Sequence, residues 1–167
     1  MNNNLYPFPI FNKLNFLTEK EYQQVELIFD LIYPSDHVNG IPGSIDAKAV
    51  DFVTQLLSFD DKVYYKISNW RLQYREGLKE LEVYSLSEYK KPLLSLVKSE
   101  ILSILKKLEK DEITNWSPTF KQSTLLELFI DHCIQGCFSD PRWGGNKNEI
   151  MWTWLGWVKP PQDINFK

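Results

Sequence analysis

The chain has 167 residues, of which 43% are hydrophobic and 25% are charged, and its formal net charge is −3. This composition is typical of one globular domain with a buried core. The slight negative charge and the absence of a strongly basic segment disfavour nucleic acid as the main partner, because neutralisation of phosphates dominates such binding. No apolar run approaches the roughly 20 residues that span a bilayer, so we expect no membrane anchor.

The N-terminal residues 1–17 predict an extended arm. Residues 2–16 alternate prolines with aromatic side chains, among them Tyr6 and Phe8, and the prolines remove backbone donors and fix φ. We expect the arm to lie across this domain or across a partner protein, with disorder as the competing interpretation. The arm shows no charged segment followed by an apolar stretch and a cleavage site, so no export signal is visible and we expect a cytoplasmic protein.

The first helix has a clear beginning and a clear end. Thr18 and Glu21 have the spacing of a capping box, which predicts that the helix starts at Thr18. Apolar residues then recur at helical spacing as far as Pro34, which ends the helix. The following loop is rich in turn-forming residues, and we expect its His37 to be solvated.

Two further helices are predicted in the next part of the chain. Ser44 or Asp46 is expected to cap the second helix, and Asp60 the third. In the third helix, apolar residues repeat every three or four positions from Val63 to Leu81. This stripe predicts a long face that packs against neighbouring helices.

One glycine and several aromatic residues stand out on that stripe. Gly77 interrupts it at a cost of about 1 kcal/mol relative to alanine, so we expect another backbone to approach closely there. The aromatic residues could stack on a sugar, but at helical spacing such residues usually belong to a core. They are Tyr64, Tyr65, Trp70, Tyr74 and Tyr84.

Three more helical segments are predicted before the C-terminal part. Residues 86–91 are expected to form a short turn of helix, and Pro92 to occupy the first position of the next helix. Ser117 and Pro118 repeat the pattern of a capping residue followed by proline, which predicts a further helix.

The sequence as a whole predicts an all-α fold. No segment alternates polar and apolar residues over a useful length, as a half-buried strand would. Residues 18–167 are expected to form a single compact domain of about five or six helices. The extended arm lies at one end of this domain, and a glycine- and tryptophan-rich loop lies near the other.

Two cysteines lie four residues apart on the last predicted helix. Cys133 and Cys137 therefore share a face, and this spacing rarely permits a disulfide within one helix. His132 is adjacent, but a zinc site needs four ligands at suitable positions and the sequence shows no such set. We expect two buried thiols at a packing face, and a bond from either cysteine to another subunit stays open.

The densest pattern is the segment 136–157, GCFSDPRWGGNKNEIMWTWLGW, which holds four of the six tryptophans. Asp140 precedes Pro141, whose ring crowds the preceding residue out of the helical region, so the helix before it must end there. Glycine and asparagine tolerate positive φ, so the run at 144–146 predicts a sharp reversal of the backbone. Asp140 and Arg142 then lie at the mouth of a tight loop, where they could pair, cap a helix or contact a partner chain.

The tryptophans of this segment suit a core edge or a protein interface. Each indole offers a large apolar area and one N–H donor. A helical or turn-like segment at 149–155 would carry Trp152 and Trp154 to different sides, so both sides would need to be covered.

The same segment resembles the signature of the gluconate 2-dehydrogenase subunit 3 family, DPRYGGN…GW…LG. Weaker similarity extends over most of the chain, from the opening helix to the residues that lead into the signature. Members of this family are small subunits of flavin-dependent sugar and alcohol dehydrogenases, whose large subunit belongs to the glucose-methanol-choline oxidoreductase superfamily. Signal-bearing members travel to the periplasm with that large subunit. The residues that match the signature are Asp140, Pro141, Arg142, Gly144, Gly145, Asn146, Trp152, Leu155, Gly156 and Trp157.

The resemblance implies a non-catalytic subunit that binds and stabilises or chaperones a large subunit carrying FAD, with a haem-bearing subunit as a possible third component. Arg142 is then a candidate for a bidentate contact with a partner carboxylate. Equally open is an intramolecular role for the loop, with Asp140 and Arg142 paired internally. The candidate interface residues are Asp140, Pro141, Arg142, Trp143, Gly144, Gly145, Asn146, Trp152, Trp157, Tyr6 and Phe8.

The chain itself shows no pattern for a cofactor, a metal or catalysis. A dinucleotide site needs a glycine-rich turn between a strand and a helix, and Gly144 and Gly145 have neither that spacing nor a preceding strand. A serine nucleophile needs a base, but no Gly-x-Ser-x-Gly turn occurs. The alternative hypothesis is a self-sufficient helical domain that binds or converts a small molecule, using aromatic residues with Asp140 and Arg142 as a pocket.

Overall fold

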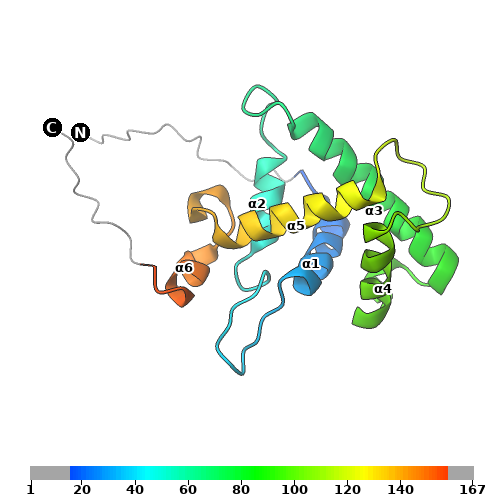
Figure 1. The fold of residues 1–167 in the computed structure, drawn as a ribbon. Coiled ribbons are helices and arrows are strands. Elements are labelled where there is room, and N and C mark those ends of the chain that lie inside the picture. The colour runs from blue at the N-terminus through cyan, green and yellow to red at the C-terminus, as the bar shows by residue number, and fades with distance from the viewer. Residues whose placement is uncertain (1–15, 158–167) are drawn as a thin grey trace.

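The computed structural model describes residues 16–157, and within that range the chain forms helices and loops without a strand (Figure 1). The predicted all-α fold is confirmed. The α-helices are α1 (Glu19–Ile32), α2 (Ala49–Leu56), α3 (Ile67–Tyr89), α4 (Lys98–Glu109), α5 (Gln122–Phe138) and α6 (Ile150–Trp154). Three short 3₁₀-helices are η1 (Leu93–Ser95), η2 (Pro141–Trp143) and η3 (Lys147–Glu149).

Helix α5 is the centre of the packing. It contacts α1, α2, α3, α4 and α6, and Figure 1 shows it in yellow, crossing the middle of the molecule. Its apolar side chains, among them the fully buried Phe129, meet Phe29 of α1 and Tyr74 of α3 in one continuous core. None of the helices within residues 16–157 is both long and apolar enough to cross a membrane.

The predicted start of α1 is confirmed. Thr18 is the N-cap, its hydroxyl accepts a hydrogen bond from the backbone N–H of Glu21, and the Glu21 carboxylate accepts one from the backbone N–H of Thr18. These bonds satisfy donors that the first turn of a helix leaves free.

The predicted caps of the next two helices are wrong. Helix α2 begins at Ala49, because the Asp46 carboxylate accepts from the backbone N–H of Gly43 and holds a turn instead. Asp60 likewise accepts from the backbone N–H of Lys62, so a loop precedes α3 and Val63 is exposed. Aspartate side chains bind nearby backbone donors in turns as readily as at helix starts.

The later helix boundaries also differ from the prediction. Helix α3 continues without a break through residues 86–89 and ends at Tyr89, and Pro92 precedes η1 rather than opening a long helix. Helix α5 begins at Gln122, beyond Ser117 and Pro118. Ser117 does not cap this helix. Its hydroxyl instead donates a hydrogen bond to a carboxylate oxygen of Glu80.

The expected backbone contact at Gly77 is a side-chain contact. A Cβ placed there would lie 2.5 Å from Cδ2 of Leu125, so the glycine makes room for a core leucine of α5. The aromatic residues on the predicted stripe divide into three groups, of which Trp70, partly buried against the core, is the intermediate one. Tyr74 and Tyr84 are buried, as expected of a core, whereas Tyr64 and Tyr65 are exposed in the loop before α3.

The polar groups of α5 that the sequence singled out are buried. Cys133 and Cys137 are both free and buried, as predicted, and their mutual contact together with burial raises the pKa of Cys133. Nδ1 of His132 lies 3.2 Å from the Tyr74 hydroxyl, and burial lowers the pKa of His132 to about 4. His132 is therefore neutral near pH 7. No group of three or more metal-binding side chains occurs within the described part of the chain.

Candidate functional site

The signature loop, residues 139–146, begins with an internal ion pair. The Arg142 guanidinium donates two hydrogen bonds to the Asp140 carboxylate, at 3.0 Å from Nε and 2.7 Å from Nη2. The backbone N–H of Arg142 also donates to Asp140, which caps η2, and Pro141 occupies the first position of that helix. Of the roles expected for Asp140 and Arg142, the structure therefore shows pairing and local capping.

The two glycines of the loop allow the backbone to touch α2 and α5. Gly144 has φ of +104°, and a Cβ there would lie 2.7 Å from the carbonyl oxygen of Asp51 in α2. A Cβ on Gly145 would lie 2.0 Å from the carbonyl oxygen of Gly136 in α5. No side chain fits at either distance, so both positions require glycine for a packing reason.

Asn146 fixes the end of the loop. It is 0% exposed and has φ of +43°, a conformation that asparagine tolerates better than most residues. Its backbone N–H donates to Gly136, its side-chain amide donates to the carbonyl of Ser139, and its side-chain oxygen accepts from the backbone N–H of Met151. Each of these hydrogen bonds therefore joins Asn146 to another part of the same chain.

The tryptophans of the segment occupy different environments. Trp143 is half-buried against Phe59, with ring centroids 5.9 Å apart. Trp152 donates its indole N–H to the carbonyl of Phe138 at 2.9 Å, and its ring centroid lies 4.4 Å from that of Trp157. Trp157 is nevertheless 49% exposed, and Trp154 is 41% exposed. We call Trp154, Leu155 and Trp157 the exposed tryptophan surface; Leu155 is 57% exposed.

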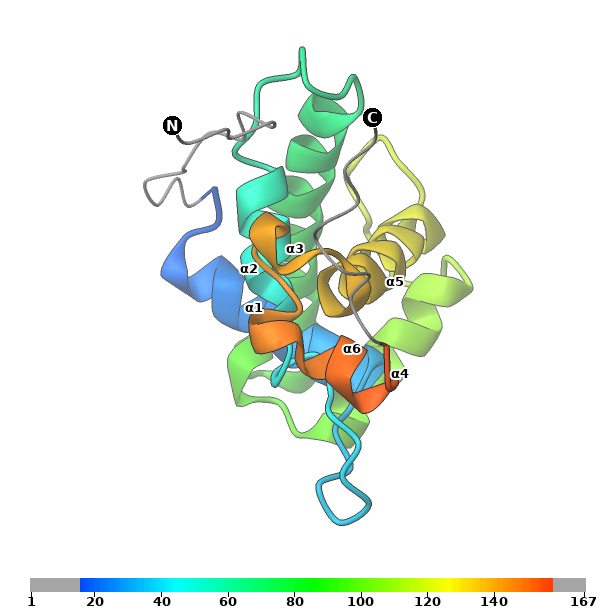
Figure 2. The same ribbon diagram turned by 90° about the vertical axis from the view of Figure 1, so that its left-hand side faces the viewer.

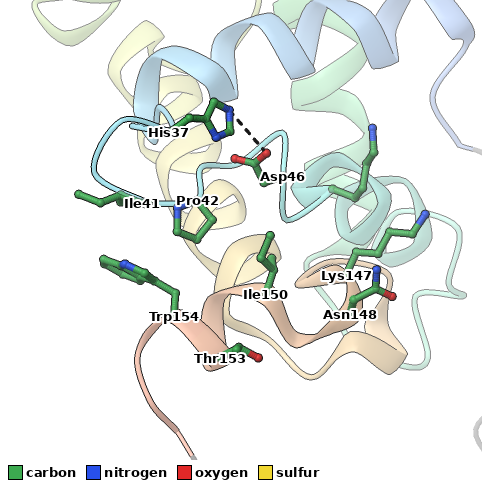
Figure 3. Close-up of a pocket in the computed structure, with 11 residues that line it drawn as sticks. His37, Ile41, Pro42, Asp46, Lys147, Asn148, Ile150, Thr153 and Trp154 are labelled. Carbon is green, nitrogen blue, oxygen red and sulfur yellow. Dashed lines mark ion pairs between the residues drawn. The ribbon is translucent and has the colours of Figure 1, made fainter.

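A groove of about 530 Å³ lies beside this surface, and the sequence analysis did not predict it (Figure 3). One wall is the loop that follows α1, which protrudes below α6 in Figure 2, and the other is the segment 147–154. The two walls are joined where the backbone N–H of Lys147 donates to the carbonyl of Ala47 at 3.0 Å. The lining residues are His37, Gly40, Ile41, Pro42, Asp46, Lys48, Lys147, Asn148, Ile150, Thr153 and Trp154.

The groove has an apolar part and a cationic end. Figure 3 shows Trp154 facing Ile41 and Pro42, with Ile150 between this group and Lys147. His37 and Asp46 form an ion pair at 3.9 Å at the rim. The turn-rich sequence and the nearby tryptophans were both visible in the sequence, but nothing in it indicated that they share a groove.

The predicted interface residues therefore lie in three different environments. The glycines and Asn146 are packed into the domain, Trp143 and Trp152 are half-buried, and Trp157 faces solvent. Tyr6 and Phe8 lie outside the described residues. Neither Asp140 nor Arg142 lines the groove.

A comparison with protein families finds a match that covers most of the chain. Residues 19–159 match the family model for gluconate 2-dehydrogenase subunit 3. The matched range begins with α1 and includes the signature loop, the exposed tryptophan surface and both walls of the groove. Neither the curated proteins nor the solved structures contain a match to the chain.

Proposed function

The chain belongs to the gluconate 2-dehydrogenase subunit 3 family, and we propose that it is the non-catalytic small subunit of an FAD-dependent sugar or alcohol dehydrogenase. The large subunit, of the glucose-methanol-choline type, binds FAD and performs the oxidation. The small subunit binds that large subunit and stabilises it or assists its folding. The same proposal has room for a haem-bearing third subunit and places the complex in the cytoplasm.

The observation that carries this proposal is the exposed tryptophan surface. Trp154, Leu155 and Trp157 present large apolar side chains to solvent within a few residues of one another. Such side chains gain free energy when a partner removes them from water, and tryptophan is among the residues that contribute most to protein interfaces. A subunit of a complex needs a surface of this kind.

The alternative, a self-sufficient small-molecule site, has weaker support. A groove of about 530 Å³ is large enough for a small ligand. However, the pair expected to supply its polar chemistry, Asp140 and Arg142, is bound to itself and does not line that groove. A self-sufficient domain also gives no reason for the exposure of Trp154 and Trp157.

Co-expression tests the proposal directly. The tagged chain is expressed with the flavin-dependent large subunit of the same organism, purified by its tag, and analysed by size exclusion and flavin absorbance. We expect one complex with a flavin spectrum, and a lower yield of soluble large subunit when the small subunit is omitted. A monomeric small subunit beside an equally soluble and active flavoprotein would contradict the proposal.

A pair of variants tests whether the large subunit binds at the exposed tryptophan surface. Trp157→Ala should lower the amount of co-purified flavoprotein at least about tenfold, as expected of a central interface tryptophan. Tyr65→Ala removes an exposed aromatic side chain from the loop before α3 and should leave the complex intact. Circular dichroism of each isolated variant checks that both remain folded.

A further inference from the structure

The groove beside the exposed tryptophan surface is held open by backbone bonds. Asp36 and Ile41 exchange backbone hydrogen bonds of 2.8 and 2.9 Å, which fix the loop of the first wall. The bond from Lys147 to Ala47 sets the spacing of the second wall from the first. These bonds join backbone groups, so a change of side chain at Ile41 or Lys147 does not remove them.

The apolar part of the groove favours an apolar occupant. Trp154 is partly exposed, and it faces Ile41 and Pro42 across the opening (Figure 3). Ile150 is half-buried and contributes further apolar surface between the walls. An apolar side chain inserted here would remove several exposed apolar groups from water at once.

The cationic end favours a carboxylate. Lys147 is exposed, and within residues 16–157 no carboxylate lies within ion-pair distance of its ammonium group. Lys48 also lines the groove and follows Ala47, whose carbonyl binds the backbone of Lys147; it is only weakly neutralised, because Glu26 lies 3.9 Å away. Asp46 is the carboxylate among the lining residues and lies beside His37 at the rim, so the two lysines give the lining a net positive charge.

We propose that this groove binds a segment of the flavin-bearing large subunit that places an apolar side chain against Trp154, Ile41 and Pro42 and a carboxylate beside Lys147. The inference rests on the proposed function. Trp154 belongs both to the groove and to the exposed tryptophan surface, so one partner can cover the two as a continuous interface. Lys147 then determines the register of the bound segment, because a charged contact specifies position more than it adds affinity.

Photo-cross-linking identifies the occupant. A photoreactive phenylalanine analogue is placed at the exposed Thr153, on the wall of the groove, and a control analogue at the exposed Tyr65. The co-expressed complex is irradiated and the linked peptides are identified by mass spectrometry. We expect the probe at position 153 to link to a large-subunit segment that contains apolar residues and a carboxylate, and the control to give no such link. Linkage to a second copy of this chain or to its own residues 158–167 would overturn the inference.

Charge reversal tests the carboxylate contact. Lys147→Glu should weaken the complex about tenfold, and the effect should shrink at high salt because ionic screening reduces repulsion. Lys62→Glu makes the same change of net charge at an exposed position away from the groove and should leave binding unchanged. If the wild-type complex forms but Lys147→Glu binds equally well, this inference fails and the proposed function stands. If no wild-type complex forms, the proposed function itself fails.

Discussion

The signature loop and the exposed tryptophan surface lie close together in the sequence but are built in opposite ways. Residues 144–146 are packed against α2 and α5, and Asn146 makes all its hydrogen bonds within the chain. Trp154 and Trp157, by contrast, leave almost half of their surface in solvent. Part of the family signature is therefore explained by the fold alone, and only the remainder needs a partner to account for it.

Matched substitutions can test the difference between packed and exposed positions, because glycine, asparagine and histidine each occur both in the interior and at the groove. Gly145, Asn146 and His132 are packed in the interior, whereas Gly40, Asn148 and His37 line the groove. In each pair, the packed residue is expected to affect stability more than its counterpart at the groove.

The glycine pair should give the largest effect. Gly145→Ala places a methyl group 2.0 Å from the carbonyl oxygen of Gly136, and neither backbone can move without unpacking α5. We expect the free energy of unfolding to fall by more than about 3 kcal/mol. Gly40→Ala meets no atom within 4 Å and carries only the strain of φ +69°, so about 1 kcal/mol is expected. Urea denaturation of both variants measures the difference, and equal losses would refute the packing argument.

The asparagine pair should give the next largest effect. Asn146→Ala leaves the backbone N–H of Met151 and the carbonyl of Ser139 without their partners inside the protein. The expected loss is about 2–3 kcal/mol, which reflects unsatisfied buried groups. Asn148→Ala changes an exposed residue that also has positive φ, so it controls for the backbone strain and should cost less than about 1 kcal/mol. Thermal unfolding followed by circular dichroism distinguishes the two, and similar shifts in melting temperature would contradict the prediction.

The histidine pair should give the smallest effect, and only at acidic pH. The pKa of His132 is about 4 in the folded chain and 6.5 for a free side chain, so the unfolded chain binds a proton first as the pH falls. Stability is therefore lost between about pH 6.5 and pH 4, and we expect a loss of about 2 kcal/mol between pH 7 and pH 5. Urea denaturation at both pH values should show that His132→Gln removes most of this loss.

The exposed His37 supplies the control for that experiment. His37→Gln removes an imidazole at the groove and should retain the pH dependence of the wild-type chain. A loss of stability that persists in His132→Gln would show that another group causes it.

The sequence predicted the fold class, the start of α1 and the position of α6, but not where the helices between them begin. Local patterns sufficed for Thr18 and Glu21, since both ends of the capping bonds lie within one turn. They failed for Asp46 and Asp60, because the same side chain can cap a helix or close a turn, and packing elsewhere decides between the two.

The candidate site was predicted in part for a similar reason. The sequence identified the residues of the signature loop but could not divide them into packed and exposed groups, because Gly144 and Gly145 are constrained by contacts with α2 and α5. The groove was missed altogether. Its walls come from distant parts of the chain, and a single sequence without aligned relatives offers no pattern that relates Ile41 to Trp154.

The separation of the groove walls along the chain has a consequence for assembly. The loop after α1 and the segment 147–154 are brought together by the packing of α5 against α1 and α2. A partner that binds both walls recognises a discontinuous surface that the unfolded or incomplete chain does not possess. Such binding is linked to folding: it stabilises the native small subunit and restricts assembly to molecules whose helices have already packed.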